Sequence, residues 1–196
     1  MLREKLKKYD IILASGSSRR QEYFKQLDID FKIELKEIEE VYPPNLIANE
    51  ITEYLAELKG QAFLSDINQN EIVVTSDTIV WHNNTALGKP KNKEEAFVML
   101  HSMSDQWHEV ITSVCFNRKN VQQTNSCTTK VKFKQLTNHE IEFYVDQFKP
   151  YDKAGAYGIQ EWIGLIAIES IEGSYANVVG LPTHLVYKMF NDLTNE

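Results

Sequence analysis

An α/β fold is predicted for this chain because strand-like and helix-like segments alternate along it. A short apolar run at residues 11–14 breaks into small polar residues and then opens a helical pattern. A second apolar, β-branched run at 71–76 lies between segments whose apolar residues recur at helical spacing. Two long strand-like stretches, 107–116 and 121–133, flank the turn residues 117–120. This alternation is typical of a sheet covered by helices.

The composition is that of an ordinary globular protein, with 42% hydrophobic and 25% charged residues among 196. The net charge of −7 argues against a nucleic acid polymer as partner, but it permits a small phosphorylated ligand held by local cations. No apolar run reaches membrane-spanning length and no signal core is present, so we expect a cytoplasmic protein without a membrane partner. The length suits a single domain, 1–196, with two lobes. Cys115 and Cys127 are expected to be buried thiols.

The turn at residues 15–18, Ser-Gly-Ser-Ser, predicts an anion site. Backbone N–H groups at a helix start are unpaired, and the helix dipole favours negative charge there. Ser15 and Ser17 lie in this turn, Ser17 or Ser18 can cap the helix, and Arg19 and Arg20 supply forked donors that suit phosphate oxygens. The spacing matches neither familiar nucleotide-binding fingerprint. The alternative interpretation is a capped helix with two solvated arginines.

The next segments supply further acidic and basic side chains. Residues 31–35 alternate as a second strand, and 37–44 form an acidic loop that ends in two prolines. Apolar residues between 51 and 62 mark one face of a helix, with Lys59 just off this face. Lysines in that position are usually solvated.

The run 71–76 is the most strand-like in the chain, and it places Asp77 at its carboxyl end. Ligands of open α/β sheets bind outside such ends, although an aspartate there can simply cap a turn. Lys89 lies in the turn 87–90, before a helix with apolar residues at 96–103. A cation at a helix start gains nothing from the helix dipole, so Lys89 is either solvated or faces an anion.

The last third of the chain contains two loops rich in small residues, 153–160 and 172–182, before a final helix. Small residues beside a tyrosine indicate that the first loop passes close to another group. Between 121 and 133, apolar residues alternate with lysines from Thr129 onward, which predicts one dry and one wet face. His108 is expected to pack or to form a hydrogen bond rather than to bind metal.

The candidate chemistry is a phosphate clamp around a divalent cation. The carboxylates of Glu39, Glu40 and Asp77 are the oxygen ligands that Mg²⁺ or Mn²⁺ prefers. The cations of the clamp would be Arg19, Arg20, Lys59 and Lys89. No nucleophile-elbow motif is present, so neither serine of the turn is expected to act as a nucleophile.

Six short motifs occur in one order between Ile12 and Pro182: Ser-Gly-Ser-Ser-Arg-Arg, Ser-Asp-Thr, Gly-Lys-Pro, His-Glu-Val-Ile-Thr, Lys-Ala-Gly-Ala-Tyr-Gly-Ile-Gln and Gly-Ser-Tyr-Ala-Asn-Val-Val-Gly-Leu-Pro. Together they closely resemble the Maf family of nucleoside triphosphate pyrophosphatases. The resemblance implies a fold like that of the inosine triphosphate pyrophosphatases, with an elongated mixed sheet flanked by helices and a cleft between two lobes. It also implies metal-dependent hydrolysis of a nucleoside triphosphate to monophosphate and pyrophosphate, and a homodimer.

The resemblance also implies roles for individual residues. Asp77 matches the catalytic base that activates water, and with Glu40 it would hold the metal. Three residues match substrate-specificity positions, namely Arg19, Thr78 and Gln160. The residues that match positions holding phosphates or metal are Arg20, Glu40, Lys59 and Lys89.

Thr78 and Gln160 resemble the branch of the family that hydrolyses dTTP and UTP, with modified pyrimidine triphosphates as further expected substrates. The Gln160 amide offers a donor and an acceptor that match the O4/N3–H edge of uracil or thymine. The chain departs from the usual motifs at Ser18, where proline is common, and at Glu161 and Trp162, which could reshape the base pocket. The alternative functions are a 7-methyl-GTP pyrophosphatase and a non-catalytic, nucleotide-binding regulator of cell division.

Overall fold

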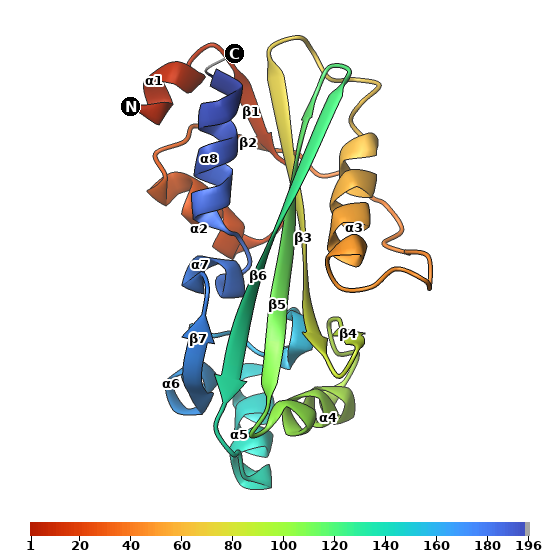
Figure 1. Ribbon diagram of the computed structural model, residues 1–196, viewed down its shortest axis with the longest axis vertical. Coiled ribbons are helices and arrows are strands. Elements are labelled where there is room, and N and C mark those ends of the chain that lie inside the picture. Colours follow the sequence, from red (N-terminus) through yellow and green to blue (C-terminus); the bar gives the residue numbers. More distant parts are fainter. Residues whose placement is uncertain (195–196) are drawn as a thin grey trace. The chain divides into compact units, whose positions relative to one another are not determined.

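The computed structural model describes residues 1–194, in which seven strands form one mixed sheet (Figure 1). The strand order is β2-β1-β3-β5-β6-β7, and β4 pairs with β3. β1 is parallel to β2 and to β3, whereas β4 is antiparallel to β3 and β7 is antiparallel to β6. The predicted α/β class is confirmed.

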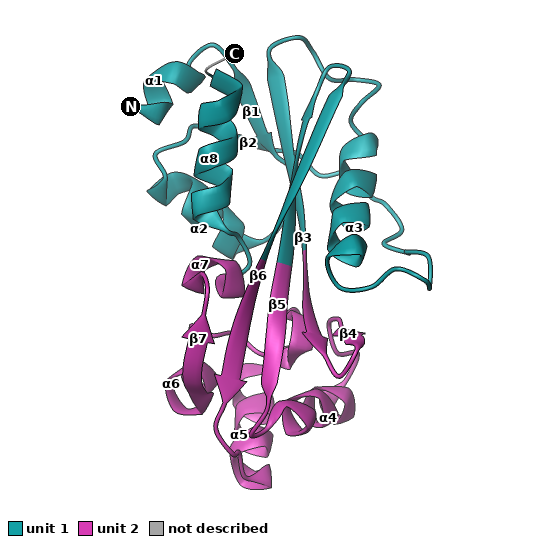
Figure 2. Ribbon diagram, in the orientation of Figure 1, with its two compact units in different colours: residues 1–77, 112–127, 180–196 teal, residues 78–111, 128–179 magenta. Residues whose placement is uncertain are grey.

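The chain divides into two compact units, coloured separately in Figure 2. Unit 1 comprises residues 1–77 and 112–127 and the chain from 180 onward, and unit 2 comprises 78–111 and 128–179. Three strands contribute residues to both units: β3 (Glu71–His82), β5 (Trp107–Arg118) and β6 (Val121–Phe133).

The other elements of unit 1 are α1 (Leu2–Leu6), β1 (Asp10–Leu13), α2 (Ser18–Gln26), β2 (Lys32–Ile33), α3 (Asn49–Gln61) and α8 (Thr183–Thr194). Successive side chains of a strand point to opposite faces of the sheet, so the consecutive apolar residues of β1 lie on both faces. Ile11 and Leu13 join the core formed with α1, α2 and α8, whereas Ile12 packs with Phe63 and Ile67, just after α3. Both faces of this part of the sheet are therefore covered.

The other elements of unit 2 are β4 (Thr85–Leu87), α4 (Lys93–Met103), α5 (Asn138–Phe148), the 3₁₀ turn η1 (Ala154–Ala156), α6 (Trp162–Ala167), β7 (Ile168–Glu172) and α7 (Tyr175–Val179). An aromatic cluster lies in its core. The rings of His108 and Tyr157 pack edge-on against Phe133, with centroids 4.8 and 5.0 Å away. His108 is 2% exposed, and its Nε2 lies 2.8 Å from the Tyr157 hydroxyl. The prediction that this histidine packs and forms a hydrogen bond is confirmed.

Several predicted boundaries are wrong. The strand predicted at 71–76 continues to His82, so Asp77 lies inside β3 rather than at its end. The continuation follows from Asn83 and Asn84, which both have positive φ and turn the chain back into β4, so that β3 gains an antiparallel partner. The strand predicted at 31–35 is reduced to the two residues of β2, which pair with β1 at the edge of the sheet. The Phe31 ring packs against Phe24, with centroids 5.4 Å apart.

Some elements were not predicted. The N-terminal segment forms α1, whose Leu2 and Leu6 are buried, and the loop predicted at 172–182 contains α7. Both are single short turns stabilised by burial rather than by a long amphipathic pattern. Conversely, Thr129, Val131 and Phe133 are fully buried on β6, which confirms its predicted dry face.

The cysteines are free thiols, with Cys115 buried and Cys127 partly exposed. Burial raises the pKa of Cys115 to about 11. Over the part of the chain that the structure describes, no helix is long and apolar enough to cross a membrane.

Candidate functional site

The predicted anion turn lies between β1 and α2 in unit 1, and its serines hold the turn itself. Ser17 is the N-cap of α2 and accepts the Arg20 backbone N–H at 3.5 Å. The Ser15 hydroxyl, which is buried, accepts the backbone N–H of Ser17 at 3.3 Å. These contacts satisfy donors that a helix start leaves unpaired, and they set the direction in which α2 leaves the strand.

Arg20 points back from α2 to the backbone of β3 at Ser76. Its Nε donates to the Gly180 carbonyl at 2.9 Å, and its Nη1 donates to the Ser76 carbonyl at 2.9 Å and to the Ser15 hydroxyl at 3.4 Å. Burial lowers the pKa of the Arg20 guanidinium, and the charges of Asp77 and Glu40 oppose this shift. Arg20 stays protonated and therefore places a fixed positive charge beside the backbone of residues 76 and 77.

Lys59 joins two of the three predicted carboxylates, Glu40 and Asp77, whereas Glu39 is exposed. Its Nζ lies 2.6 Å from Asp77 Oδ1 and 3.2 Å from Glu40 Oε1. The Lys59 and Asp77 side chains are only 17% and 10% exposed, whereas that of Glu40, in the acidic loop, is 49% exposed. A buried ammonium–carboxylate pair is costly to desolvate and is kept only with close contacts, so this pair is a strong candidate for chemistry.

The same side chains fit a divalent cation. Glu40 and Asp77 each direct a carboxylate oxygen toward the same atom, Lys59 Nζ. Among residues 1–194, no group of three or more His, Cys, Asp or Glu side chains is arranged as a complete metal site. Mg²⁺ commonly uses one or two carboxylates and takes its other ligands from water and substrate phosphates, so two carboxylates are sufficient donors.

Arg19 is half-buried on α2 in unit 1, and unit 2 holds the remaining three predicted residues. Thr78 is half-buried in β3, and Lys89 and Gln160 are exposed, in the turn after β4 and in the loop after η1. The backbone N–H of Gly155 donates to the carbonyl of Gly88 at 3.0 Å, which ties this loop to the turn that carries Lys89. Gly155 has φ of +66°, and a Cβ there would lie 2.7 Å from a methyl group of Val80. The small residue predicted to allow a close approach is therefore required here.

Two of the three side chains that depart from the family motif, Glu161 and Trp162, contact α5. Glu161 accepts a hydrogen bond from the hydroxyl of Tyr144 and pairs with Lys153, whose Nζ is 3.0 Å from Glu161 Oε1. The Trp162 ring packs edge-on against Phe143, with centroids 4.8 Å apart. No sequence motif indicated this network, because its members lie on α5, in the loop and at the start of α6.

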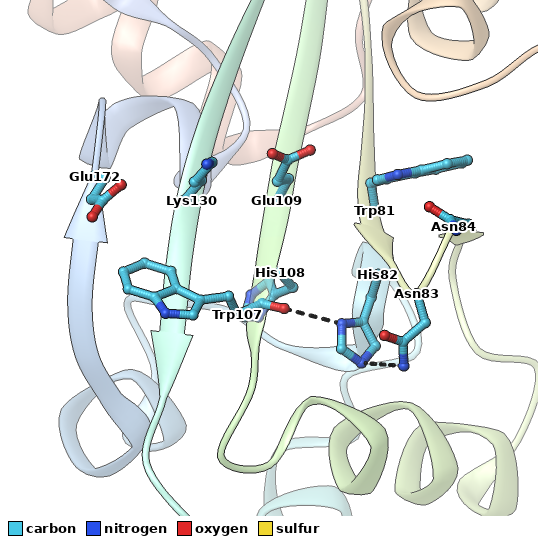
Figure 3. Close-up of a pocket in the computed structure, with 9 residues that line it drawn as sticks. All are labelled: Trp81, His82, Asn83, Asn84, Trp107, His108, Glu109, Lys130 and Glu172. Atoms are coloured by element: carbon cyan, nitrogen blue, oxygen red, sulfur yellow. Dashed lines mark hydrogen bonds between the residues drawn. The ribbon is translucent and has the colours of Figure 1, made fainter.

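A cavity of about 690 Å³ opens on unit 2, lined by side chains of β3, β5, β6 and β7 (Figure 3). Trp81 and Trp107 lie on its wall, and His82 Nδ1 is 3.2 Å from the Trp107 carbonyl. None of the ten residues predicted to bind substrate or metal lines this cavity. The candidate site is therefore defined by the charged side chains described above and not by this cavity.

Solved structures share this fold at low sequence identity. The Ham1 protein of Staphylococcus aureus superposes with a TM-score of 0.51 at 16% identity, covering 92% of this chain and 99% of that one. A HAM1 protein from Coxiella burnetii gives the same TM-score at 14% identity, covering 94% and 99%. The predicted mixed sheet flanked by helices is thus also found in known proteins.

Relatives of much higher identity match nearly the whole chain. A dTTP/UTP pyrophosphatase of Flavobacterium johnsoniae is 61% identical over 193 residues, covering 98% of this chain and 100% of that protein. The dTTP/UTP pyrophosphatase of Christiangramia forsetii is 55% identical over 195 residues, covering 100% of both. The family model of Maf-like proteins matches residues 10–193. The chain therefore belongs to the Maf family.

Proposed function

We propose that this chain hydrolyses dTTP and UTP to the nucleoside monophosphate and pyrophosphate. The observation that carries the proposal is the buried pair of Lys59 and Asp77 beside Glu40, next to the fixed charge of Arg20. Cations and a carboxylate in this arrangement suit the hydrolysis of a phosphoanhydride, where positioning and charge neutralisation supply most of the catalysis. The names of the close relatives support the same reaction and the same substrates.

In this mechanism, Lys59 and Arg20 offset the negative charge of the triphosphate, and Arg19 and Lys89 add further cations. Asp77 orients a water molecule and accepts its proton. The water oxygen forms a bond to the α-phosphorus as the bond from this phosphorus to the bridging oxygen breaks, and pyrophosphate leaves with that oxygen. A general base placed in this way contributes about 10²-fold or more to the rate.

Glu40 and Asp77 are proposed to hold a Mg²⁺ or Mn²⁺ ion. Such an ion, when bound, offsets charge on the phosphate oxygens. The Lys59 ammonium contacts both carboxylates, so it offsets their mutual repulsion and orients them in the protein alone.

The base would be selected by Gln160 and Thr78, with Arg19. The Gln160 side chain is exposed and carries both a donor and an acceptor, which match the O4/N3–H edge of uracil or thymine. A site that hydrogen-bonds one edge rejects a base with the reverse pattern, because polar groups would remain unpaired.

The proposal is tested by pyrophosphate release from dTTP, UTP, CTP, GTP and 7-methyl-GTP with Mg²⁺ or Mn²⁺. Turnover confined to dTTP and UTP is the expected result. Release from 7-methyl-GTP alone would keep the reaction and reject the assigned base specificity. Nucleotide binding without any release would instead support a non-catalytic regulator.

A further inference from the structure

We propose that Tyr144, Lys153 and Glu161 are positioning residues that fix the loop carrying Gln160 and thereby set the choice of base without touching the substrate. The inference rests on the proposed function, since it assigns a cause to the selectivity of that site. All of the residues concerned lie in unit 2, on α5, in the loop 153–161 and at the start of α6.

The first contact runs through Tyr144, which is fully buried on α5. Its hydroxyl donates to the Glu161 carboxylate and accepts the backbone N–H of Gly158 at 3.1 Å. Burial and the neighbouring Glu161 charge raise the pKa of Tyr144, so the hydroxyl keeps the proton that it donates. Tyr144 thus holds both the backbone of Gly158, before Gln160, and the side chain of Glu161, after it.

The second contact compensates the charge of Glu161. Lys153 Nζ lies 3.0 Å from Glu161 Oε1 and 2.7 Å from Asp152 Oδ1, and its side chain is 11% exposed. A Cβ on Gly158 would lie 3.0 Å from Lys153 Cε and 3.1 Å from Glu161 Cδ. The loop backbone therefore packs directly on this ion pair, and only a residue without a side chain leaves the pair undisturbed.

The third contact closes the loop on the other side. A Cβ on Gly164 would lie 1.8 Å from the carbonyl oxygen of Ile159, so α6 packs against the residue that precedes Gln160. The Gly164 backbone N–H donates to the Glu161 carbonyl at 2.9 Å. Residues 158, 159 and 161 are each held in place, while the Gln160 side chain between them remains exposed.

This arrangement matters for selectivity because an amide distinguishes uracil from cytosine only through the order of its donor and acceptor. The edge of cytosine presents the reverse order of hydrogen-bonding groups at the corresponding positions. A loop that moves lets the amide shift or turn, and the penalty for the wrong base falls. Preorganised contacts of this kind typically govern discrimination rather than the chemical step.

The experiment compares Tyr144→Phe and Glu161→Gln with two controls on exposed side chains of the same unit, Tyr151→Phe and Glu169→Gln. The measured quantity is the ratio of kcat/KM for UTP to that for CTP. We expect the two anchor variants to lower this ratio by about tenfold, mainly through a higher KM for UTP, while the controls leave it unchanged. A lower melting temperature with an unchanged ratio would assign the network a merely structural role and overturn the proposal.

A second measurement, hydrogen exchange of the nucleotide-free protein, needs no turnover. Tyr144→Phe should speed exchange of the amides of residues 158–161, and Tyr151→Phe should not. If exchange is unchanged, the anchor does not hold the loop and the proposal is wrong. If the unmodified protein releases no pyrophosphate, the proposed function fails by itself, and the ratio of dissociation constants for UTP and CTP in the same variants then decides the inference.

Discussion

Asp77 is 7% exposed in β3, and its carboxylate contacts the Lys59 ammonium. Asp77→Asn keeps the size of the side chain and removes the proton acceptor. We therefore expect kcat for dTTP to fall by about 10²-fold or more, with circular dichroism and the melting temperature close to those of the unmodified protein. Near-normal turnover of this variant would contradict the role of Asp77 as the base.

His108 gives a prediction about stability at this scale. Burial holds the pKa of His108 at about 3 in the folded protein, compared with an ordinary value of 6.5. As the pH falls below 6.5 the unfolded chain takes up a proton that the folded protein does not, so stability decreases by about 1.4 kcal/mol per pH unit. Urea unfolding at pH 7 and pH 5 should show this loss, of about 2 kcal/mol, in the unmodified protein but not in His108→Gln.

Two features make this comparison specific. His139→Gln, which changes an exposed histidine, should keep the pH dependence of the unmodified protein. The pKa of Glu140 is about 2, lowered by the Thr137 backbone N–H and then by Lys134. The stability that Glu140 contributes is therefore lost only as the pH falls below about 4.5, outside the range of this comparison. Equal pH dependence in His108→Gln and the unmodified protein would show that His108 takes up a proton in the folded state.

At the scale of elements, the candidate site depends on how α3 packs against β3 in unit 1. The Thr75 hydroxyl donates to the Ala56 carbonyl at 2.7 Å, and the Gly60 backbone lies against Asn117. Asn117 is itself held by the Val73 carbonyl at 3.0 Å. These contacts bring the helix close enough for Lys59 to reach Asp77 on β3.

Gly60→Ala tests this packing. Alanine normally stabilises a helix relative to glycine, but here its Cβ would lie 2.1 Å from Asn117 Oδ1. We expect the free energy of unfolding to fall by about 1–3 kcal/mol, as is typical of overpacking. Gly88→Ala is the control, because a Cβ at that glycine meets nothing within 4 Å. A stabilised Gly60→Ala variant would show that α3 can move away from β3.

For the whole molecule, the question is whether the two units unfold together. The unit boundaries fall inside β3, β5 and β6, so the chain passes from one unit to the other within strands and not through a linker. Breaking a strand midway would expose unpaired backbone groups, which is costly. We therefore expect one cooperative transition, in keeping with the prediction of a single domain over 1–196.

The chain carries separate probes for the two units. Trp81, Trp107 and Trp162 all lie in unit 2, whereas Cys115 and Cys127 lie in unit 1. Tryptophan fluorescence and thiol labelling in increasing urea should give the same midpoint. Two separated midpoints would show that the units are independent domains.

Local patterns determined much of the fold and the identity of the site residues. The alternation of apolar residues identified the main strands and helices, since burial of one face imposes a period on the sequence. The ordered motifs predicted the Maf family, which the family match confirms. The end of β3 was missed although Asn83-Asn84 is a turn signal, because the hairpin partner β4 has only three residues.

The contacts of the site were decided only by the tertiary structure. Lys59 lies 18 positions from Asp77, and Arg20 lies 56 positions from the Ser76 carbonyl that it binds and 160 from that of Gly180. Tyr144 and Glu161 likewise meet only because α5 packs beside the loop. A sequence pattern reports which face of an element is buried, but not which distant side chain meets it there. That choice depends on the packing of whole elements, which is a property of the complete chain.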